Sequence, residues 1–363
     1  MGTLAIAAGT ATSSQAVALA DAPLFSTMNV PGNLALALSV EYPTAISVAN
    51  LGDYVHANTY LGYFDPDKCY DYTFVKAAPD TSYFQPAGKA NKHTCSSKWS
   101  GNFMNWASMQ TIDPFRWALT GGYRETDLAS STILQKAHGS AQGSASGNYP
   151  YRGTDIGTGN KITGTDVVKV TPMTGTRFNT RLWGKGIDMV FSTANSTNYQ
   201  NDSPNNLKQY GDGTSSSNNY YVKIRVKVCE NTTASGGLES NCVKYGSNYK
   251  PEGLMQKYSD KIRYSAFGYL NQGGGSRQGG VLRAKMGFIG PDKPVAMSTT
   301  PEDNATKEWS KSTGIMEANP DATLATASGV SNSGVMNYLN QFGNYSKGYM
   351  SYDNVSEMYY AAV

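Results

Sequence analysis

The chain has 363 residues, of which 39% are hydrophobic and 16% are charged, and its formal net charge is only +3. Because Lys and Arg form no long run, this charge argues against nucleic-acid binding, which requires clustered cations against the phosphates. The sequence has no stretch of about 18 apolar residues, so we expect no membrane-spanning helix. An excess of Gly (38) and Tyr (25) favours strands and long loops and is typical of bacterial extracellular surface proteins.

The first residues have features of an exported protein. Residues 1–20 contain no charged residue, are rich in alanine and include Ala18-Leu19-Ala20, which resembles a signal-peptidase cleavage pattern. The basic region and the strong apolar run of a complete signal peptide are missing. We therefore interpret residues 1–20 as a signal-peptide remnant and expect a secreted protein.

Four cysteines fall into two pairs that are local in the sequence, Cys69 with Cys95 and Cys229 with Cys242. Neither pair has the C-x-x-C spacing of a zinc site or a closely spaced pair of histidines beside it. Four cysteines allow three connectivities, and we predict these two bonds because each closes a short loop. Such oxidation indicates the periplasm or the exterior of the cell. Four free buried thiols in a cytosolic protein are the alternative.

The helical signal is clearest in residues 99–119. Apolar side chains recur there at spacings of three and four, which predicts one buried face, most simply a core-packing face: Phe103, Trp106, Met109, Ile112, Phe115 and Leu119. We expect Ser100 to cap this helix, Asp113 and Pro114 to interrupt it and cap a second short helix, and Gly121 to end that second helix.

Strands are predicted from three other patterns. Residues 34–40 are a short apolar run, which indicates a buried strand in the centre of a sheet. Residues 221–228 alternate apolar with basic side chains, which predicts a strand with a solvated basic face. We expect this strand to form a hairpin with residues 242–245, closed by the second disulfide. Residues 262–270 and 281–289 flank a glycine-rich loop and predict another hairpin.

Motifs for catalysis are missing from the sequence. Three histidines occur, His56, His93 and His138, each in a polar loop context, and no H-E-x-x-H, G-x-S-x-G or P-loop pattern is present. We therefore expect no catalytic residue, no cofactor and no enzymatic activity. A pair of carboxylates for glycoside hydrolysis stays open, because the separation of such a pair is spatial.

Calcium is the metal that the sequence leaves open. Asp65, Asp67 and Asp71 alternate in a turn, and their carboxylates could ligate this ion. The spacing of an EF-hand loop, with its glycine and its terminal glutamate, is missing. A loop that merely turns is the alternative interpretation.

Several segments together resemble one family. Residues 99–107 read WSGNFMNWA, which resembles a block of the PilC/PilY family of type IV pilus tip adhesins and biogenesis factors, and the resemblance extends to residue 122. Further matching segments follow in the family's order over nearly the whole chain, at residues 62–70, 132–137, 249–254, 260–264, 279–283 and 355–362.

The resemblance implies an α/β fold similar to a von Willebrand A domain. In such a fold, helices flank a sheet, and here large β-hairpin and loop insertions would elaborate it at about residues 50–98 and 138–250. One adhesin domain would occupy residues 21–363. The β-propeller that normally follows in the family is expected to be absent from this sequence.

The metal site of many relatives is degenerate in this chain. These relatives carry D-x-S-x-S after the first strand, where an aspartate and two hydroxyls hold a divalent cation. The corresponding stretch here offers Ser39, Glu41 and Thr44, and Pro43 takes the place of the second hydroxyl. We therefore expect no metal at this strand end.

The resemblance also implies a function at the cell surface. The chain would be exported through the periplasm to the pilus tip and act as an adhesin and pilus assembly factor. Its partners would be minor pilins and a host or abiotic surface. A structural surface or filament subunit without adhesive activity is the alternative. A surface protein that binds or degrades polysaccharide is a third hypothesis.

Overall fold

The structure is a computed structural model of the whole chain. It describes residues 30–38, 47–138, 152–157, 159–182, 187–192, 219–269, 280–296, 298–328, 331–341 and 355–363. The fold is mixed α/β, and the strands among these residues form five separate sheets. The predicted signal-peptide remnant lies outside the described residues.

A six-stranded sheet combines segments from distant parts of the chain. Its members are β2 (Lys68–Thr73), β3 (Tyr83–Lys89), β4 (Trp99–Ser100), β5 (Arg124–Leu128), β6 (Ser131–Gln135) and β11 (Arg225–Val228). Their order in the sheet is β4-β2-β3-β11-β6-β5. β11 therefore lies in the middle, parallel to β3 and antiparallel to β6.

A second, four-stranded sheet packs near the first. Its order is β10-β9-β8-β7, and its members are β7 (Arg152–Gly153), β8 (Asn179–Leu182), β9 (Asp188–Ser192) and β10 (Asn219–Lys223). Aromatic rings of Phe191 in β9 and of Phe178, directly before β8, pack against residues 99–103. The rings of Trp99 and Phe191 have centroids 5.0 Å apart, and those of Phe103 and Phe178 lie 5.3 Å apart. These rings belong to the main hydrophobic core.

The two helices predicted within residues 99–119 are confirmed as α2 (Gly101–Ser108) and α3 (Ile112–Thr120). Ser100 caps α2 as expected, because its hydroxyl oxygen accepts the N–H of Phe103 at 3.3 Å. Gly121 ends α3 in the left-handed region, with φ of 81°. Every residue of α2 is buried, so the aromatic stripe packs into the core as predicted.

The interruption between the helices lies earlier than the sequence indicated, at residues 109–111. Asp113 lies inside α3 and does not cap it. Its carboxylate accepts the N–H of Gln110 at 2.9 Å and the guanidinium of Arg116 at 2.9 Å. A buried ion pair thus fixes the start of α3, while Phe115 from the predicted apolar stripe is 40% exposed.

The alternating segment 221–228 is not one arm of the expected hairpin. It divides at Ile224 into β10 and β11, which belong to different sheets. Residues 242–245 form β12 (Cys242–Tyr245) and pair with β13 (Asn248–Pro251) instead. The apolar face is buried as predicted, at Val222, Ile224, Val226 and Val228.

The basic face of this segment is paired with carboxylates and is not simply solvated. Lys223 Nζ lies 2.9 Å from Asp188 and 3.0 Å from Asp80, and the lysine is only 7% exposed. Arg225 lies 3.1 Å from Glu125. Asp80, Asp188 and Glu125 are distant in sequence from this segment, so alternation alone could not reveal these ion pairs.

The third sheet contains β1 (Gly32–Leu38), β14 (Ile262–Gly268) and β15 (Val281–Gly287), in the order β1-β14-β15. The predicted hairpin is confirmed as β14 and β15, which pair antiparallel. β1 pairs parallel with β14. The prediction of a buried central strand is wrong for β1, because this strand lies at the edge of the described sheet and is mostly exposed, with Leu34 at 42%.

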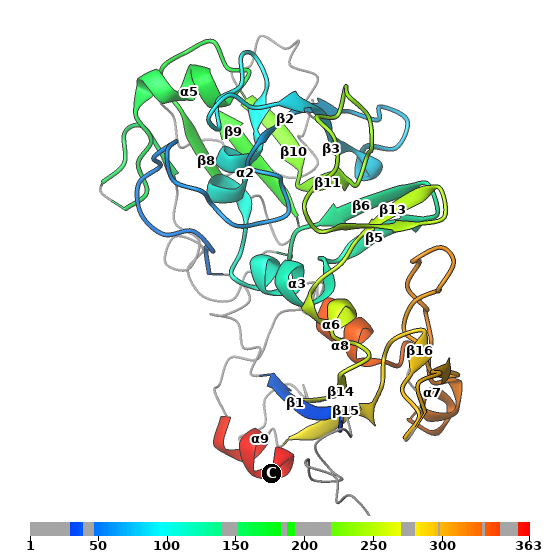
Figure 1. Cartoon of the computed structure of the whole chain (residues 1–363). Helices are drawn as coiled ribbons and strands as arrows, with labels where there is room; N and C mark the ends of the chain where they lie inside the picture. The colour runs from blue at the N-terminus through cyan, green and yellow to red at the C-terminus, as the bar shows by residue number, and fades with distance from the viewer. Residues whose placement is uncertain are drawn as a thin grey trace, which may run out of the picture.

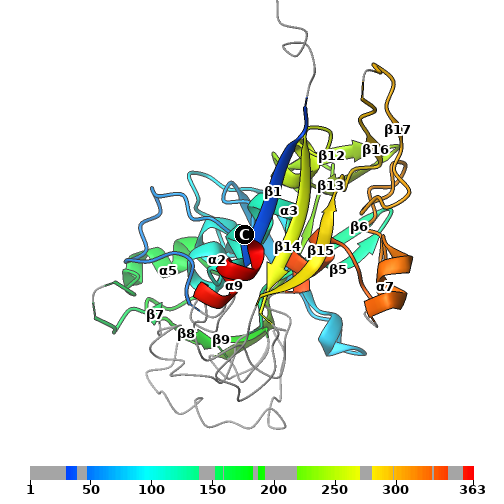
Figure 2. The same cartoon turned by 90° about the horizontal axis from the view of Figure 1, so that it is seen from below.

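The remaining elements complete the described fold: the 3-10 helix η1 (Pro79–Thr81), α5 (Gly164–Val170), α6 (Leu254–Lys257), α7 (Ala322–Ser328), α8 (Val335–Gln341), α9 (Val355–Ala362), β16 (Asp292–Lys293) and β17 (Glu302–Asp303). In Figure 1, α3, α6 and α8 lie between the six-stranded sheet and the sheet of β1. Figure 2 shows α9 beside that sheet, and α9 contacts all three of its strands. None of the described helices is long and apolar enough to cross a bilayer.

The start of α8 depends on one buried carboxylate. Glu308 accepts the N–H groups of Val335 and Met336, each at 2.7 Å, and is 4% exposed. Burial raises the pKa of Glu308 from 4.5 to about 7, although the two hydrogen bonds lower it. The folded chain therefore keeps a proton on Glu308 in a pH range where the unfolded chain has released it.

We expect the stability of the fold to fall as the pH rises from about 4.5 to about 7. The fall should be on the order of 2–3 kcal/mol, because a raised carboxyl pKa stabilises the fold fully only below the pKa of the unfolded chain. Urea denaturation at a series of pH values measures this slope. Glu308→Gln should flatten it in this interval, and an unchanged slope in that variant would contradict the assignment.

Candidate binding pocket

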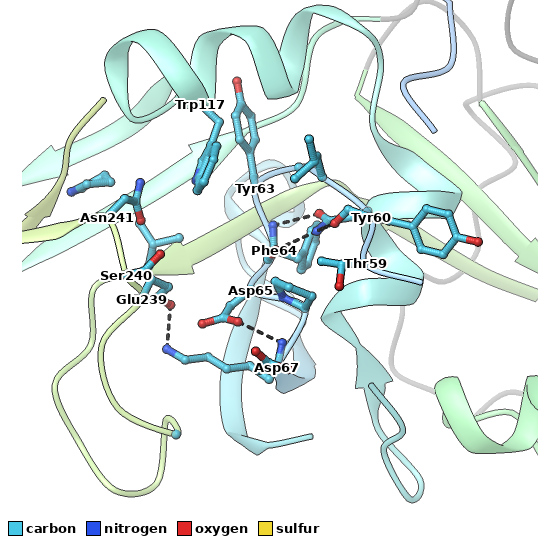
Figure 3. A pocket seen from close by; sticks show the side chains of 18 of the residues that line it. Thr59, Tyr60, Tyr63, Phe64, Asp65, Asp67, Trp117, Glu239, Ser240 and Asn241 are labelled. Carbon is cyan, nitrogen blue, oxygen red and sulfur yellow. Dashed lines mark hydrogen bonds and ion pairs between the residues drawn. The ribbon is translucent and has the colours of Figure 1, made fainter. Parts of the chain in front are cut away.

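A pocket of about 700 Å³ lies where residues 59–68, helix α3 and residues 236–241 meet. Figure 3 shows Trp117 projecting from α3 between the two loop segments, with the carboxylate of Asp65 pointing across the gap toward the segment of residues 239–241. Ligand sites in proteins have volumes of this order. We call this cavity the Trp117 pocket.

Two buried asparagines of α2 hold one wall of the pocket. Asn105 accepts the N–H of Phe64 at 3.0 Å and donates to the carbonyls of Tyr60 at 2.9 Å and Phe64 at 2.7 Å. Asn102 accepts the N–H of Tyr60 at 2.8 Å and donates to the carbonyl of Asn58 at 2.8 Å. The two side chains thus form hydrogen bonds with backbone N–H and C=O groups that have no partner in a neighbouring strand. This explains why a buried helix face carries polar residues.

Close approach between this wall and α2 requires two glycines. A β-carbon at Gly62 would lie 2.3 Å from Asn105 Oδ1, and one at Gly101 would lie 2.0 Å from the carbonyl oxygen of Asp65. The N–H of Asp65 donates to the hydroxyl of Tyr70 at 2.8 Å. Burial raises the pKa of Tyr70 well above its usual value, so this hydroxyl stays protonated.

A buried ion pair joins this wall to the other one. Lys68 Nζ lies 2.8 Å from Glu239 Oε1, and the two side chains are only 2% and 8% exposed. Lys68 also donates to the carbonyl of Gly237 at 2.5 Å, and Glu239 accepts the N–H of Cys229 at 2.8 Å. Every charge in this contact is matched by a close partner, so the pair fixes the width of the pocket.

Both walls are also held by disulfides. Cys69 bonds to Cys95 and Cys229 bonds to Cys242, with Cα atoms 5.7 Å and 5.6 Å apart. These are the two pairs expected from the sequence, and no cysteine is free. Cys69 directly follows Lys68, and the second disulfide closes the loop that carries Glu239. The ion pair is therefore anchored by a covalent bond on each side.

Polar groups that can still form hydrogen bonds with a ligand line the interior of the pocket. Asp65 accepts the N–H of Asp67 at 2.9 Å through one carboxylate oxygen. Asn241 makes a long contact of 3.4 Å to the carbonyl of Glu252. Among the described residues, the side chains of Trp117 and Ser240 have no hydrogen-bond partner. The pocket thus combines an accessible indole with a carboxylate, an amide and a hydroxyl.

The structure does not gather the three aspartates that the sequence suggested for calcium. Asp67 lies 3.6 Å from His93 Nε2, and Asp71 forms an ion pair with Lys98. Asp65 and Asp67 both line the pocket, and the carboxylate of Asp65 points toward its opposite wall in Figure 3. The residues proposed as a degenerate metal site, Ser39, Glu41 and Thr44, lie outside the described residues.

Within the described part of the chain, one group of side chains has the spacing of metal ligands: Cys229, Glu239 and Cys242. Both sulfurs of this group are bonded to each other in the disulfide, which leaves neither as a thiolate ligand. The carboxylate of Glu239 is engaged by Lys68. This group serves as a structural clamp.

Sequence reasoning missed the pocket because its two walls are far apart in the chain. Trp117, Glu239 and Asn241 carry no motif that would identify them. The polar residues Asn102 and Asn105 in the middle of an apolar helical stripe were the available signal, since buried amides need partners from elsewhere.

Comparisons with known proteins agree with the sequence resemblance. The family profile described as "PilY1 homolog, small alpha/beta domain" matches residues 52–227. A protein of Xylella fastidiosa (strain Temecula1 / ATCC 700964), named type IV pilus biogenesis factor PilY1 homolog, is 41% identical over 95% of this chain and 29% of its own length. A second protein of that strain with the same name is 28% identical over 63% of this chain and 16% of its own length.

No solved structure is similar to the chain at a significant level. The chain spans less than a third of the length of the curated relatives that it matches. The profile covers one wall of the Trp117 pocket and ends before the other, which begins at residue 236.

Proposed function

The chain belongs to the PilY1 family, and we propose that it forms part of a type IV pilus biogenesis factor that is exported to the cell surface. It acts there by binding, without a cofactor and without turnover. The name of the relative that is 41% identical over 95% of this chain carries the proposal. The two disulfides support it, because such bonds persist in oxidising compartments.

Within this function, we propose that the chain contributes adhesion at the pilus tip and contacts minor pilins. The Trp117 pocket supports an adhesive role, because its walls are fixed by buried amides, an ion pair and disulfides before any ligand arrives. Preorganised walls lose little conformational entropy on binding, so more of the interaction energy appears as affinity.

We also propose that the sheet of β1, β14 and β15 corresponds to part of a von Willebrand A-like core. The parallel pairing of β1 with β14 and the packing of α8 and α9 on this sheet support the proposal. The body between Leu38 and Ile262 would then be an insertion between two neighbouring strands. An experimental structure whose sheet has a different strand order would contradict it.

Deletion of the gene in the bacterium that encodes the chain tests the pilus function. We expect fewer pili in electron micrographs and weaker attachment to surfaces, because a biogenesis factor is needed for both. Re-expression of the wild-type gene is the control and should restore both properties. Normal pilus number in the deletion strain would overturn the proposal. Filaments formed by the purified protein alone would favour a structural subunit instead.

A further inference from the structure

We propose that the Trp117 pocket binds a neutral oligosaccharide. This inference rests on the proposed surface-binding function and names the class of ligand for it. The stacking surface, the hydrogen-bonding groups, the charge and the rigidity of the pocket all suit such a ligand.

The stacking surface is the indole of Trp117. This side chain is partly buried against the main core, which fixes its orientation, and its remaining surface lines the pocket. A pyranose ring presents a face of C–H groups that is apolar and carries a slight positive charge. The face of an indole is negative and apolar, so the two surfaces are complementary in shape and charge.

The polar groups around Trp117 suit the hydroxyl edge of a sugar. Asp65 offers a second carboxylate oxygen, and Asn241 offers an amide that accepts and donates. Ser240 and the indole N–H add a hydroxyl and a donor. Adjacent hydroxyls of a sugar can donate to a carboxylate and accept from an amide, so each of these groups can find a partner.

The charge of the pocket excludes an anionic ligand. The charge of Lys68 is neutralised by Glu239 at 2.8 Å. The other charged groups that line the pocket are the carboxylates of Asp65 and Asp67 and the ammonium of the exposed Lys89. Bringing a sulfate, phosphate or uronate beside two carboxylates would be repulsive. A neutral ligand that donates hydrogen bonds avoids this repulsion.

The size and rigidity of the pocket fit an oligosaccharide of a few units. About 700 Å³ is enough for more than one hexose ring. Sugar binding is weak per hydroxyl, because each hydrogen bond replaces one to water. A site that is fixed in advance by Asn105 and the Lys68–Glu239 pair reduces the entropic loss on binding.

Binding is measured with the full chain by ligand-detected NMR and calorimetry, using cellotriose, maltotriose and chitotriose as probes. We expect at least one of the three to bind, and Trp117→Ala to weaken that binding about tenfold or more. Asn241→Ala on the opposite wall should weaken it about threefold or more. Phe115→Ala is the matched control, because this exposed aromatic residue lies on the same helix outside the pocket lining.

The inference is overturned if none of the three probes binds, or if Trp117→Ala and Asn241→Ala both leave the binding unchanged. Binding of tri-lysine or of tri-galacturonate in preference to the neutral probes would also overturn it. Circular dichroism of each variant shows whether it is folded. If Trp117→Ala does not fold, the effect of Asn241→Ala on binding still tests the inference.

The same variants separate this inference from the proposed pilus function. If Trp117→Ala loses sugar binding and cells that carry it have normal pilus number but attach more weakly, the pocket acts in adhesion and not in pilus assembly. If no sugar binds but deletion of the gene removes pili, the biogenesis function stands and the oligosaccharide inference fails.

Discussion

Lys68→Met is expected to lower the free energy of unfolding by about 3–5 kcal/mol. Methionine fills much of the space of the lysine stem but leaves the carboxylate of Glu239 buried, at 8% exposure, without its cation. The carbonyl of Gly237 also loses its donor. Urea denaturation with both disulfides intact measures the loss. Because Lys68 ties the two walls of the Trp117 pocket together, the variant should also weaken binding of any ligand there.

The chain offers a matched control for this variant. Lys98→Met breaks an ion pair with Asp71, but these side chains are 36% and 54% exposed. An exposed pair contributes about 0–1 kcal/mol, so Lys98→Met should have little effect. The double variant Lys68→Met with Glu239→Gln removes the uncompensated charge and should recover most of the stability. Equal effects of Lys68→Met and Lys98→Met would contradict a structural role for the buried pair.

Asn105→Asp should destabilise the chain by about 3–6 kcal/mol at neutral pH. The substitution changes no volume, but it removes both donors to the carbonyls of Tyr60 and Phe64. It also places a carboxylate against these two carbonyl oxygens in a fully buried site. The wall of residues 59–64 then loses its anchor, so amide hydrogen exchange should rise there first.

Acid provides an internal check on this variant. Protonation of the new carboxyl removes its charge and restores one donor, so Asn105→Asp should regain part of its stability as the pH falls toward 4. Asn231→Asp is the isosteric control, because Asn231 is exposed and makes only a long contact of 3.4 Å to the hydroxyl of Tyr249. If Asn105→Asp lowers the free energy of unfolding no more than Asn231→Asp does, Asn105 does not hold the wall.

Local patterns predicted local structure well. The apolar stripe, Ser100 and Gly121 located two helices to within a few residues, because caps and periodicity depend on neighbours in the sequence. The hairpin of β14 and β15 followed from two apolar runs around glycines for the same reason. The two cysteine pairs were found because each bond closes a short loop.

Pairing between distant segments could not be predicted from these patterns. Residues 221–228 alternate between apolar and basic side chains, yet they divide between two sheets. One part pairs with residues 188–192, and the other pairs with residues 83–89 and 131–135. The exposure of β1 likewise depends on what covers it and not on its own apolar sequence. The pocket requires Lys68 to meet Glu239, and nothing near either residue identifies its partner.

The parallel pairing of β1 with β14 has a consequence for the order of folding. Gly32 pairs with Ile262, so the chain must close a loop of more than two hundred residues before these strands meet. The β5–β6 and β12–β13 pairs and both disulfide loops lie within that loop and can form first. β1 is therefore synthesised early, stays unpaired as an apolar segment while the loop folds, and is the last of these elements to pair. An unpaired apolar strand can pair with other chains, so a chaperone that holds it apart should raise the yield of folded chain.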